Sequence, residues 1–250
     1  MDNQLVVFIT GAGRGLGNTL AQVYLSRPNC TVIGSIRDEN SSGVSELKTS
    51  PTGNGSKLLP VKIESSVFGD AKRVVEEIKA EGVDHIDIVI ANSAISPPIL
   101  PLEDVDLEQV VDAFNVNAVG AIALYQACYP LLEKSSSAKF VTISSAAGSI
   151  SAMEPFHSYV APAYCISKAA LNWITMAAHC GNKWLTAVAV NPGLVDTDMG
   201  KGTAEYLGLE KPTYTKLYSA EKITSLIDNA SRANTSGKFI NVIDGKEIPW

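Results

Sequence analysis

Apolar residues occur along the chain in two alternating patterns. Short runs rich in Val, Ile and Phe, such as 4–10 and 138–144, are typical of strands buried on both faces of a parallel sheet. Longer segments between these runs place their apolar residues at helical spacing. The patterns predict strands near 4–10, 30–36, 57–62, 84–91, 138–144, 184–190 and 238–243, with helices near 15–27, 41–49, 67–81, 103–133 (broken), 161–180 and 219–233.

This alternation predicts an α/β fold, a Rossmann-type doubly wound sheet of seven mostly parallel strands flanked by helices. Because no linker or repeat interrupts it, we interpret residues 1–250 as one domain. Two stretches, 149–163 and 199–218, depart from the alternation and follow the carboxyl ends of strands. Ligands bind at that edge of a doubly wound sheet, so we expect these stretches to be substrate loops rather than plain surface loops.

Charge and composition narrow the partners. The net charge of −6 argues against nucleic acid or an anionic membrane surface. No apolar run is long enough to span a bilayer, and Met1–Gln4 lacks the basic region of a signal peptide. Four scattered cysteines fit a reducing compartment, and the histidines lack zinc-ligand spacing. We therefore expect a cytoplasmic protein that binds a small molecule and no metal.

The first predicted strand ends in a glycine-rich turn, Thr10-Gly11-Ala12-Gly13-Arg14-Gly15-Leu16-Gly17. Glycines between a strand and a helix let the backbone approach a pyrophosphate, and the helix N-terminus offers unpaired N–H groups. The common GxGxxG pattern would require glycine at position 16, which is leucine. The glycines instead fit TGxxxGxG, which in this place predicts a dinucleotide site.

The end of the second strand indicates which dinucleotide. The segment reads Ile33-Gly34-Ser35-Ile36-Arg37, with no carboxylate before Asp38. A carboxylate there would bind the ribose hydroxyls of NAD, whereas arginines at 37 and 14 could hold the 2′-phosphate of NADP. We predict NADP(H), with NAD as the alternative through Asp38 if both arginines are merely solvated.

Two motifs carry candidate chemistry in the second half of the chain. Tyr164 and Lys168 stand four apart and share one helix face. An ammonium beside a phenol favours the phenolate and lowers its pKa, so the two are suited to acid/base work. Upstream, Val141-Thr142-Ile143-Ser144-Ser145 predicts a strand ending in serines. One hydroxyl there could hold a substrate carbonyl, or both could simply cap backbone groups.

In order along the chain, these motifs and Asn191-Pro192-Gly193-Leu194-Val195-Asp196-Thr197 resemble the short-chain dehydrogenase/reductase family. The likeness extends over nearly the whole chain. Segments 82–96 and 139–155 are most similar to the carbonyl-reductase branch that includes fungal norsolorinic acid ketoreductase and the fly sniffer protein.

The resemblance implies roles for individual residues. Tyr164 would be the general acid, Lys168 would bind the nicotinamide ribose and lower the tyrosine pKa, and Ser145 would orient the carbonyl. Asn117 would hold a water in a proton relay. The implied cofactor contacts are Gly11, Arg14, Gly15, Leu16, Gly17, Arg37, Ile63, Asn92, Tyr164, Lys168, Pro192, Gly193, Val195 and Thr197, and the implied substrate contacts are Ser145, Met153, Phe156 and Tyr164.

The chain departs from the family pattern in three places. Ala94 replaces the glycine of the usual Asn-Asn-Ala-Gly, and Lys62 replaces an acidic residue that often lies over the adenine. The stretch between Ser145 and Tyr164 is also longer than usual. We expect the additional residues to form part of the substrate wall, and we interpret His157 and Glu154 within it as rim residues rather than a second acid/base pair.

The resemblance implies an NADPH-dependent ketoreductase for a bulky, aromatic or polyketide-like ketone, as in fungal secondary metabolism. The alternatives are a non-redox isomerase, dehydratase or cyclase on the same scaffold, and a cofactor-sensing protein without catalysis. The family also implies a homodimer or tetramer through two long helices. Small residues in 113–132 suit such helix contacts, although they could equally pack inside the subunit.

Overall fold

The computed structural model describes residues 4–250, so Met1–Asn3, part of the segment compared with a signal peptide, lie outside it. The chain forms one seven-stranded sheet in the order β3-β2-β1-β4-β5-β6-β7. All neighbouring strands pair in parallel. The strands are β1 (Leu5–Ile9), β2 (Cys30–Ile36), β3 (Lys57–Lys62), β4 (Ile88–Ala91), β5 (Lys139–Ile143), β6 (Thr186–Asn191) and β7 (Phe239–Asn241).

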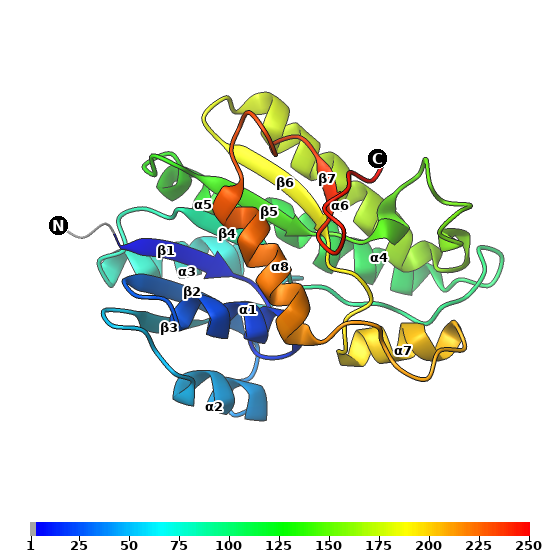
Figure 1. Ribbon diagram of the computed structural model, residues 1–250, viewed down its shortest axis with the longest axis horizontal. Coiled ribbons are helices and arrows are strands. Elements are labelled where there is room, and N and C mark those ends of the chain that lie inside the picture. Colours follow the sequence, from blue (N-terminus) through cyan, green and yellow to red (C-terminus); the bar gives the residue numbers. More distant parts are fainter. Residues whose placement is uncertain (1–3) are drawn as a thin grey trace.

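Helices cover both faces of this sheet (Figure 1). Because alternate residues of a strand point to opposite faces, β1 sends Phe8 toward one apolar core and Val7 toward another. The Phe8 core lies under α3, α5 and α6, and the Val7 core lies under α1 and α8. The helices are α1 (Gly15–Leu25), α2 (Ser42–Thr49), α3 (Gly69–Ala80), α4 (Leu107–Phe114), α5 (Gly120–Leu132), α6 (Pro162–Gly181), α7 (Asp198–Tyr206) and α8 (Lys216–Asn229). The predicted doubly wound α/β fold is confirmed.

Three elements differ in detail from the predicted pattern. The break expected within 103–133 is a π-helical turn, Asn115–Val119, between α4 and α5. The strand predicted near 84–91 begins only at Ile88, and the Asp87 carboxylate just before it accepts a hydrogen bond from the Val6 N–H at 2.9 Å. The stretch 199–218 contains a helix, α7, that the apolar pattern missed because few of its residues are buried.

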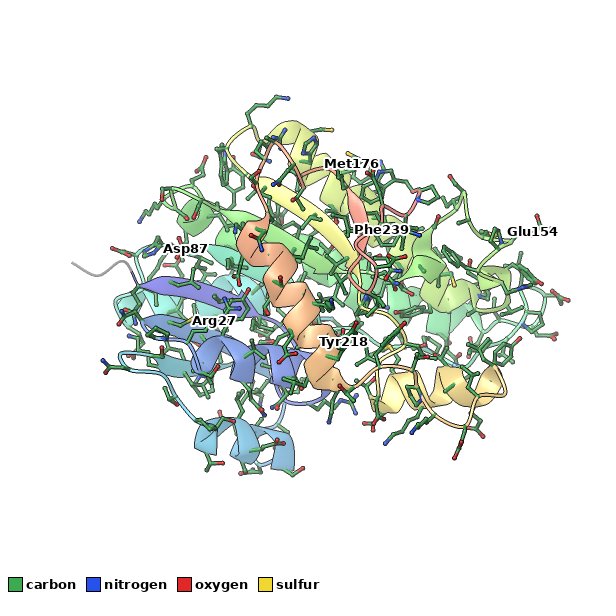
Figure 2. All side chains as sticks on the ribbon, viewed as in Figure 1. Arg27, Asp87, Glu154, Met176, Tyr218 and Phe239 are labelled. Carbon is green, nitrogen blue, oxygen red and sulfur yellow. The ribbon has the colours of Figure 1, made fainter. Side chains whose placement is uncertain are left out.

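The parallel arrangement brings the carboxyl ends of all strands to one edge of the sheet. In Figure 2, Glu154 marks this edge, on the chain between β5 and α6, while Asp87 marks the opposite edge. The glycine-rich turn after β1, the serines after β5 and the segment after β6 meet at the carboxyl edge. Among residues 4–250, no helix is both long and apolar enough to cross a membrane.

Candidate active site

The glycine-rich turn requires glycine at three of its four glycine positions. Gly11 and Gly15 have φ angles of +70° and +59°, in the left-handed region. A Cβ atom on Gly17 would lie 2.3 Å from the Gly11 carbonyl oxygen, so α1 could not approach the turn with any side chain there. Gly13, by contrast, has ordinary van der Waals space for a Cβ. This geometry matches the TGxxxGxG interpretation and not GxGxxG.

The N-terminus of α1 leaves its first N–H groups available to a ligand. Its N-cap residue, Arg14, makes no side-chain hydrogen bond to the helix, and the first turn carries no acidic side chain. These N–H groups and the positive end of the helix dipole therefore form a cradle for an anion. The Leu16 side chain is buried in the core, so only its backbone can contribute to that cradle.

Thr10 and Asn92 join the turn to the end of β4. The Thr10 hydroxyl accepts hydrogen bonds from the N–H groups of Asn92 and Ser93, at 3.0 and 3.1 Å. The Asn92 amide donates to the Thr10 carbonyl at 2.8 Å. These hydrogen bonds thus join the ends of the adjacent strands β1 and β4. They are all present although Ala94 replaces the usual glycine.

Arg14 and Arg37 lie on the open side of the turn, and both are exposed. An Arg14 guanidinium nitrogen, Nη1, lies 3.4 Å from Asp198 Oδ2 at the start of α7. An exposed ion pair of this length is weak, so Arg14 remains available to a phosphate. Asp38 is exposed beside Arg37. At the end of β2, both Arg37, the candidate for binding NADP, and Asp38, the candidate for binding NAD, therefore reach solvent. Ile63 lies next to them at the end of β3.

The structure distinguishes the two serines after β5. Ser144 is only 2% exposed, and its hydroxyl donates to Asn172 Oδ1 at 2.6 Å. Ser145 is partly exposed, accepts a hydrogen bond from the Ala147 N–H at 3.2 Å, and lies close enough to Tyr164 for their hydroxyls to hydrogen-bond. The Ser145 hydroxyl can therefore meet a substrate carbonyl, whereas Ser144 is held in the core.

Tyr164 and Lys168 occupy the first two turns of α6. Lys168 is 2% exposed, donates from Nζ to the Ile143 carbonyl at 2.8 Å, and lies 5.5 Å from the centre of the Tyr164 ring. Burial raises the pKa of Tyr164 to about 12, although hydrogen bonding with Ser145 acts to lower it. Burial also lowers the pKa of Lys168 to about 7.

The expectation that Lys168 lowers the pKa of Tyr164 stays a prediction. Removal from water disfavours the phenolate of Tyr164 and the ammonium of Lys168 alike, and it is the largest influence on the pKa of each group. A tyrosine with a pKa of about 12 keeps its proton at neutral pH. It is thus suited to donate a proton.

Asn117 lies in the π-helical turn and is 1% exposed. Its amide group donates to the Ile95 carbonyl and to the Ser167 hydroxyl, both at 2.9 Å, and it accepts from the Ile95 N–H at 2.8 Å. Both side-chain donors are thus used inside the protein. Any water held at Asn117 would have to bind another of its atoms.

The segment after β6 closes the site from the other side. Val195 pairs with Tyr214, and Thr197 caps α7 by accepting a hydrogen bond from the Gly200 N–H at 3.1 Å. Gly193 has a φ of +80°, and a Cβ there would lie 2.8 Å from the Tyr214 ring. The Thr197 side chain also lies next to Gly15 of the glycine-rich turn. Thr197 is therefore brought beside the anion cradle, and contact of residues 192–197 with the nicotinamide stays a prediction.

The predicted substrate residues Met153 and Phe156 are exposed on the chain between Ser145 and Tyr164. The His157 ring contacts the Tyr159 hydroxyl at 3.3 Å, while its hydrogen bond to Glu154, at 3.1 Å, joins main-chain atoms only, which fits the interpretation as rim residues. One further candidate, the segment 94–106 after β4, held through Ile95, escaped sequence reasoning. Met199 and Tyr206 of α7 are exposed within the predicted substrate stretch 199–218. Three prolines in 94–106 are the signal that could have indicated an ordered loop.

Fold and site together define a dinucleotide-binding oxidoreductase with a tyrosine, a lysine and a serine at its centre. The model of the short chain dehydrogenase family matches residues 5–207. The chain belongs to this family, which confirms the predicted family and the class of enzyme.

Several known proteins are similar over nearly their full lengths. Short-chain dehydrogenase srdF of Neurospora crassa is 44% identical over 98% of this chain and 97% of that protein. Norsolorinic acid ketoreductase nor1 of Dothistroma septosporum is 36% identical, over 97% and 91%. The structure of an NADPH-bound carbonyl reductase from chicken fatty liver superposes with a TM-score of 0.86 at 26% identity, covering 100% of this chain and 96% of that one.

Proposed function

We propose that the chain is an NADPH-dependent ketoreductase that reduces a bulky, aromatic or polyketide-like ketone, as in fungal secondary metabolism. The observation that carries the proposal is the group formed by Ser145, Tyr164 and Lys168 beside the anion cradle of α1. The similarity to a norsolorinic acid ketoreductase and to an NADPH-bound carbonyl reductase supports both the reaction and the cofactor.

The residues fit NADPH, which supplies hydride when bound. The glycine-rich turn and the α1 N-terminus would hold the pyrophosphate, and Arg14 and Arg37 would hold the 2′-phosphate. Thr197 and the backbone of Val195 would position the nicotinamide, and Lys168 its ribose. Asn92 and Ile63 would line the adenosine half.

The chain's own groups then serve the carbonyl. Charge develops on its oxygen during reduction, and the hydroxyls of Ser145 and Tyr164 are placed to meet that charge. Tyr164 donates the proton that completes the alcohol. With a pKa of about 12 the group is protonated at neutral pH, the form from which a proton can be donated. The exposed apolar side chains Met153, Phe156, Met199 and Tyr206 suit a large aromatic substrate.

The test is oxidation of NADPH and NADH across a panel of aromatic and polyketide-like ketones. We expect NADPH to be preferred, and turnover to fall by about a thousandfold or more in Tyr164→Phe while NADPH binding persists. A clear NADH preference would contradict the roles of Arg14 and Arg37. Cofactor binding without turnover of any ketone would favour an isomerase, dehydratase or cyclase, and unchanged biological activity of Tyr164→Phe would favour a cofactor sensor.

We also propose that the chain forms a homodimer through α4 and α6. Leu107, Val111 and Phe114 recur at i, i+4 and i+7 on the outer face of α4, and Trp173 lies exposed on α6. The two helices pack side by side, so these residues form one exposed apolar face. The argument from small residues is not supported, because Ala113, Ala118 and Ala121 are buried within the subunit.

A cytoplasmic location remains part of this proposal. All four cysteines are free thiols, as in a reducing compartment. Fluorescence microscopy of a tagged chain in a fungal host would test it, and signal confined to an organelle would contradict it.

A further inference from the structure

A small apolar cluster lies directly behind the serine turn at the carboxyl edge. Its buried members are Ala189, Phe239 and Ile248, and Ala146 and Trp250 pack against them. Phe239 begins β7 and is labelled in Figure 2, and the chain's last residues run beside β7 and α6 in Figure 1. Because Ala146 directly follows Ser145, residues 248–250 support the turn that carries the carbonyl-orienting hydroxyl.

Residues 248–250, which we call the 248–250 segment, are attached to the sheet. The Ile248 N–H donates to the Phe239 carbonyl at 2.7 Å. The Trp250 ring stacks on the Phe239 ring, with centroids 5.6 Å apart and planes inclined by 24°. A main-chain hydrogen bond and an aromatic stack therefore attach this segment to β7, so it can serve as a fixed support.

The 248–250 segment in turn holds the beginning of the 149–163 loop. The Ser151 N–H donates to the Trp250 main-chain oxygen at 3.0 Å, and the Ser149 hydroxyl donates to the Pro249 carbonyl at 2.5 Å. The same hydroxyl accepts from the Ala152 N–H at 3.1 Å. Ser149 is 1% exposed, so its hydroxyl has no competing contact with bulk water.

The other end of the loop is held by α6. Cys165 Sγ donates to the Ser158 carbonyl at 3.0 Å, and the Cys165 N–H donates to the Ala161 carbonyl at 2.9 Å. Between the two anchored ends, Met153 and Phe156 are exposed and apolar. The loop thus has two fixed ends and a free apolar middle, and it joins Ser145 to Tyr164 in the sequence.

We propose that the 248–250 segment is a positioning element that sets the entrance of the 149–163 loop and thereby the affinity for a bulky ketone. It acts through Trp250 and Ser149 and touches neither substrate nor cofactor. The inference rests on the proposed function for its substrate. Its structural half, the ordering of the loop, does not depend on that function.

The experiment compares Trp250→Ala and Ser149→Ala with their conservative partners Trp250→Phe and Ser149→Thr. Lys246→Ala is the matched control, because Lys246 is exposed and contacts the neighbouring strand only through its backbone. Three quantities are measured in the full chain. They are KM and kcat for a bulky aromatic ketone and for a small one, Kd for NADPH, and the rate of chymotrypsin cleavage within 149–163.

For both alanine variants we expect KM for the bulky ketone to rise about fivefold or more, the effect of one lost hydrogen bond in Ser149→Ala and of one lost aromatic stack in Trp250→Ala. KM for the small ketone, kcat and the NADPH Kd should change less than twofold, and loop cleavage should accelerate. Trp250→Phe and Ser149→Thr should restore KM, since the ring and the hydroxyl remain. A merely structural defect would instead lower kcat and weaken NADPH binding together.

Unchanged KM and unchanged cleavage in both alanine variants would overturn the proposal, as would faster cleavage with unchanged KM for the bulky ketone. If the wild-type chain reduces no ketone, the proposed function fails. The cleavage rates alone then test whether the 248–250 segment orders the 149–163 loop. Equal rates in Trp250→Ala and Lys246→Ala would then refute the positioning role, and faster cleavage in Trp250→Ala alone would support it.

Discussion

At the scale of single residues, burial controls the protonation of Tyr164 and Lys168, the proposed catalytic pair. Within residues 4–250 the Lys168 ammonium pairs with no carboxylate and donates to the Ile143 carbonyl, and desolvation lowers its pKa from 10.5 to about 7. The same desolvation keeps Tyr164 protonated. The site therefore combines a proton donor with a lysine that titrates near neutral pH.

This shift predicts a pH-dependent stability. The unfolded chain binds more protons at Lys168 than the folded chain does between about pH 7 and 10.5, so this group makes the protein more stable as pH rises across that window. Lys168→Met removes the effect. Without cofactor, the melting temperature of the variant should exceed that of the wild type by the largest amount at pH 7 and below. This difference should shrink toward pH 10.

Melting temperatures of both proteins from pH 6 to 10 would check this prediction. Lys246→Met, at an exposed lysine, is the control and should show a constant difference. The lost hydrogen bond to Ile143 adds only an offset that does not change with pH. A Lys168→Met difference that is flat across the range would contradict the lowered pKa.

At the scale of elements, the glycine-rich turn offers a matched pair of substitutions. In Gly17→Ala the new Cβ would meet the Gly11 carbonyl oxygen at 2.3 Å, so α1 must move away from the turn. We expect a loss of about 1–3 kcal/mol of stability and at least a tenfold weaker Kd for NADPH. Gly13→Ala meets nothing closer than 3.5 Å and should keep both values. Fluorescence titration and urea unfolding would measure them.

The C-terminus of α6 carries a second prediction at this scale. The Arg232 guanidinium donates to the main-chain carbonyls of His179, Asn182 and Leu185, at 2.8–3.1 Å. Removing the guanidinium takes away the donor that these three carbonyls share, so Arg232→Ala should cost about 2–3 kcal/mol of stability. The nearby exposed Lys183→Ala should cost less than about 0.5 kcal/mol. Equal unfolding midpoints for the two variants would refute the capping role.

At the scale of the whole molecule, the exposed face of α4 and α6 is the surface through which we propose that the chain dimerises. Leu107 and Trp173 are 74% and 72% exposed, and a charge on this face would have to be buried in a dimer. We therefore expect Trp173→Glu to be monomeric at concentrations where the wild type is dimeric. Sedimentation velocity would measure this, with Leu217→Glu, on the exposed surface of α8, as the control that remains a dimer. A monomeric wild type would refute the proposed dimer.

Much of the fold followed from local patterns. Runs of β-branched residues such as Cys30–Ile36 are buried throughout, so their apolar character alone indicates a strand. A break within 103–133 was also expected, although the pattern could specify neither its position at Asn115–Val119 nor its π-helical form. Helix α7 escaped because it packs on the rim of the site and buries only Gly200 and Ala204. An element with almost no core face has no apolar period to detect.

The catalytic groups were recognisable because their spacing is local. Tyr164 and Lys168 meet within two turns of one helix, and the three required glycines act within one turn, so residue order alone determined these candidates and the parallel α/β arrangement around them. Only the tertiary structure separated Ser145 from Ser144, through the hydrogen bond from Ser144 to Asn172. It also decided the pKa of Tyr164 and placed Trp250 behind the 149–163 loop. Burial and contacts between residues far apart in sequence arise only when the chain folds, and no local pattern contains them.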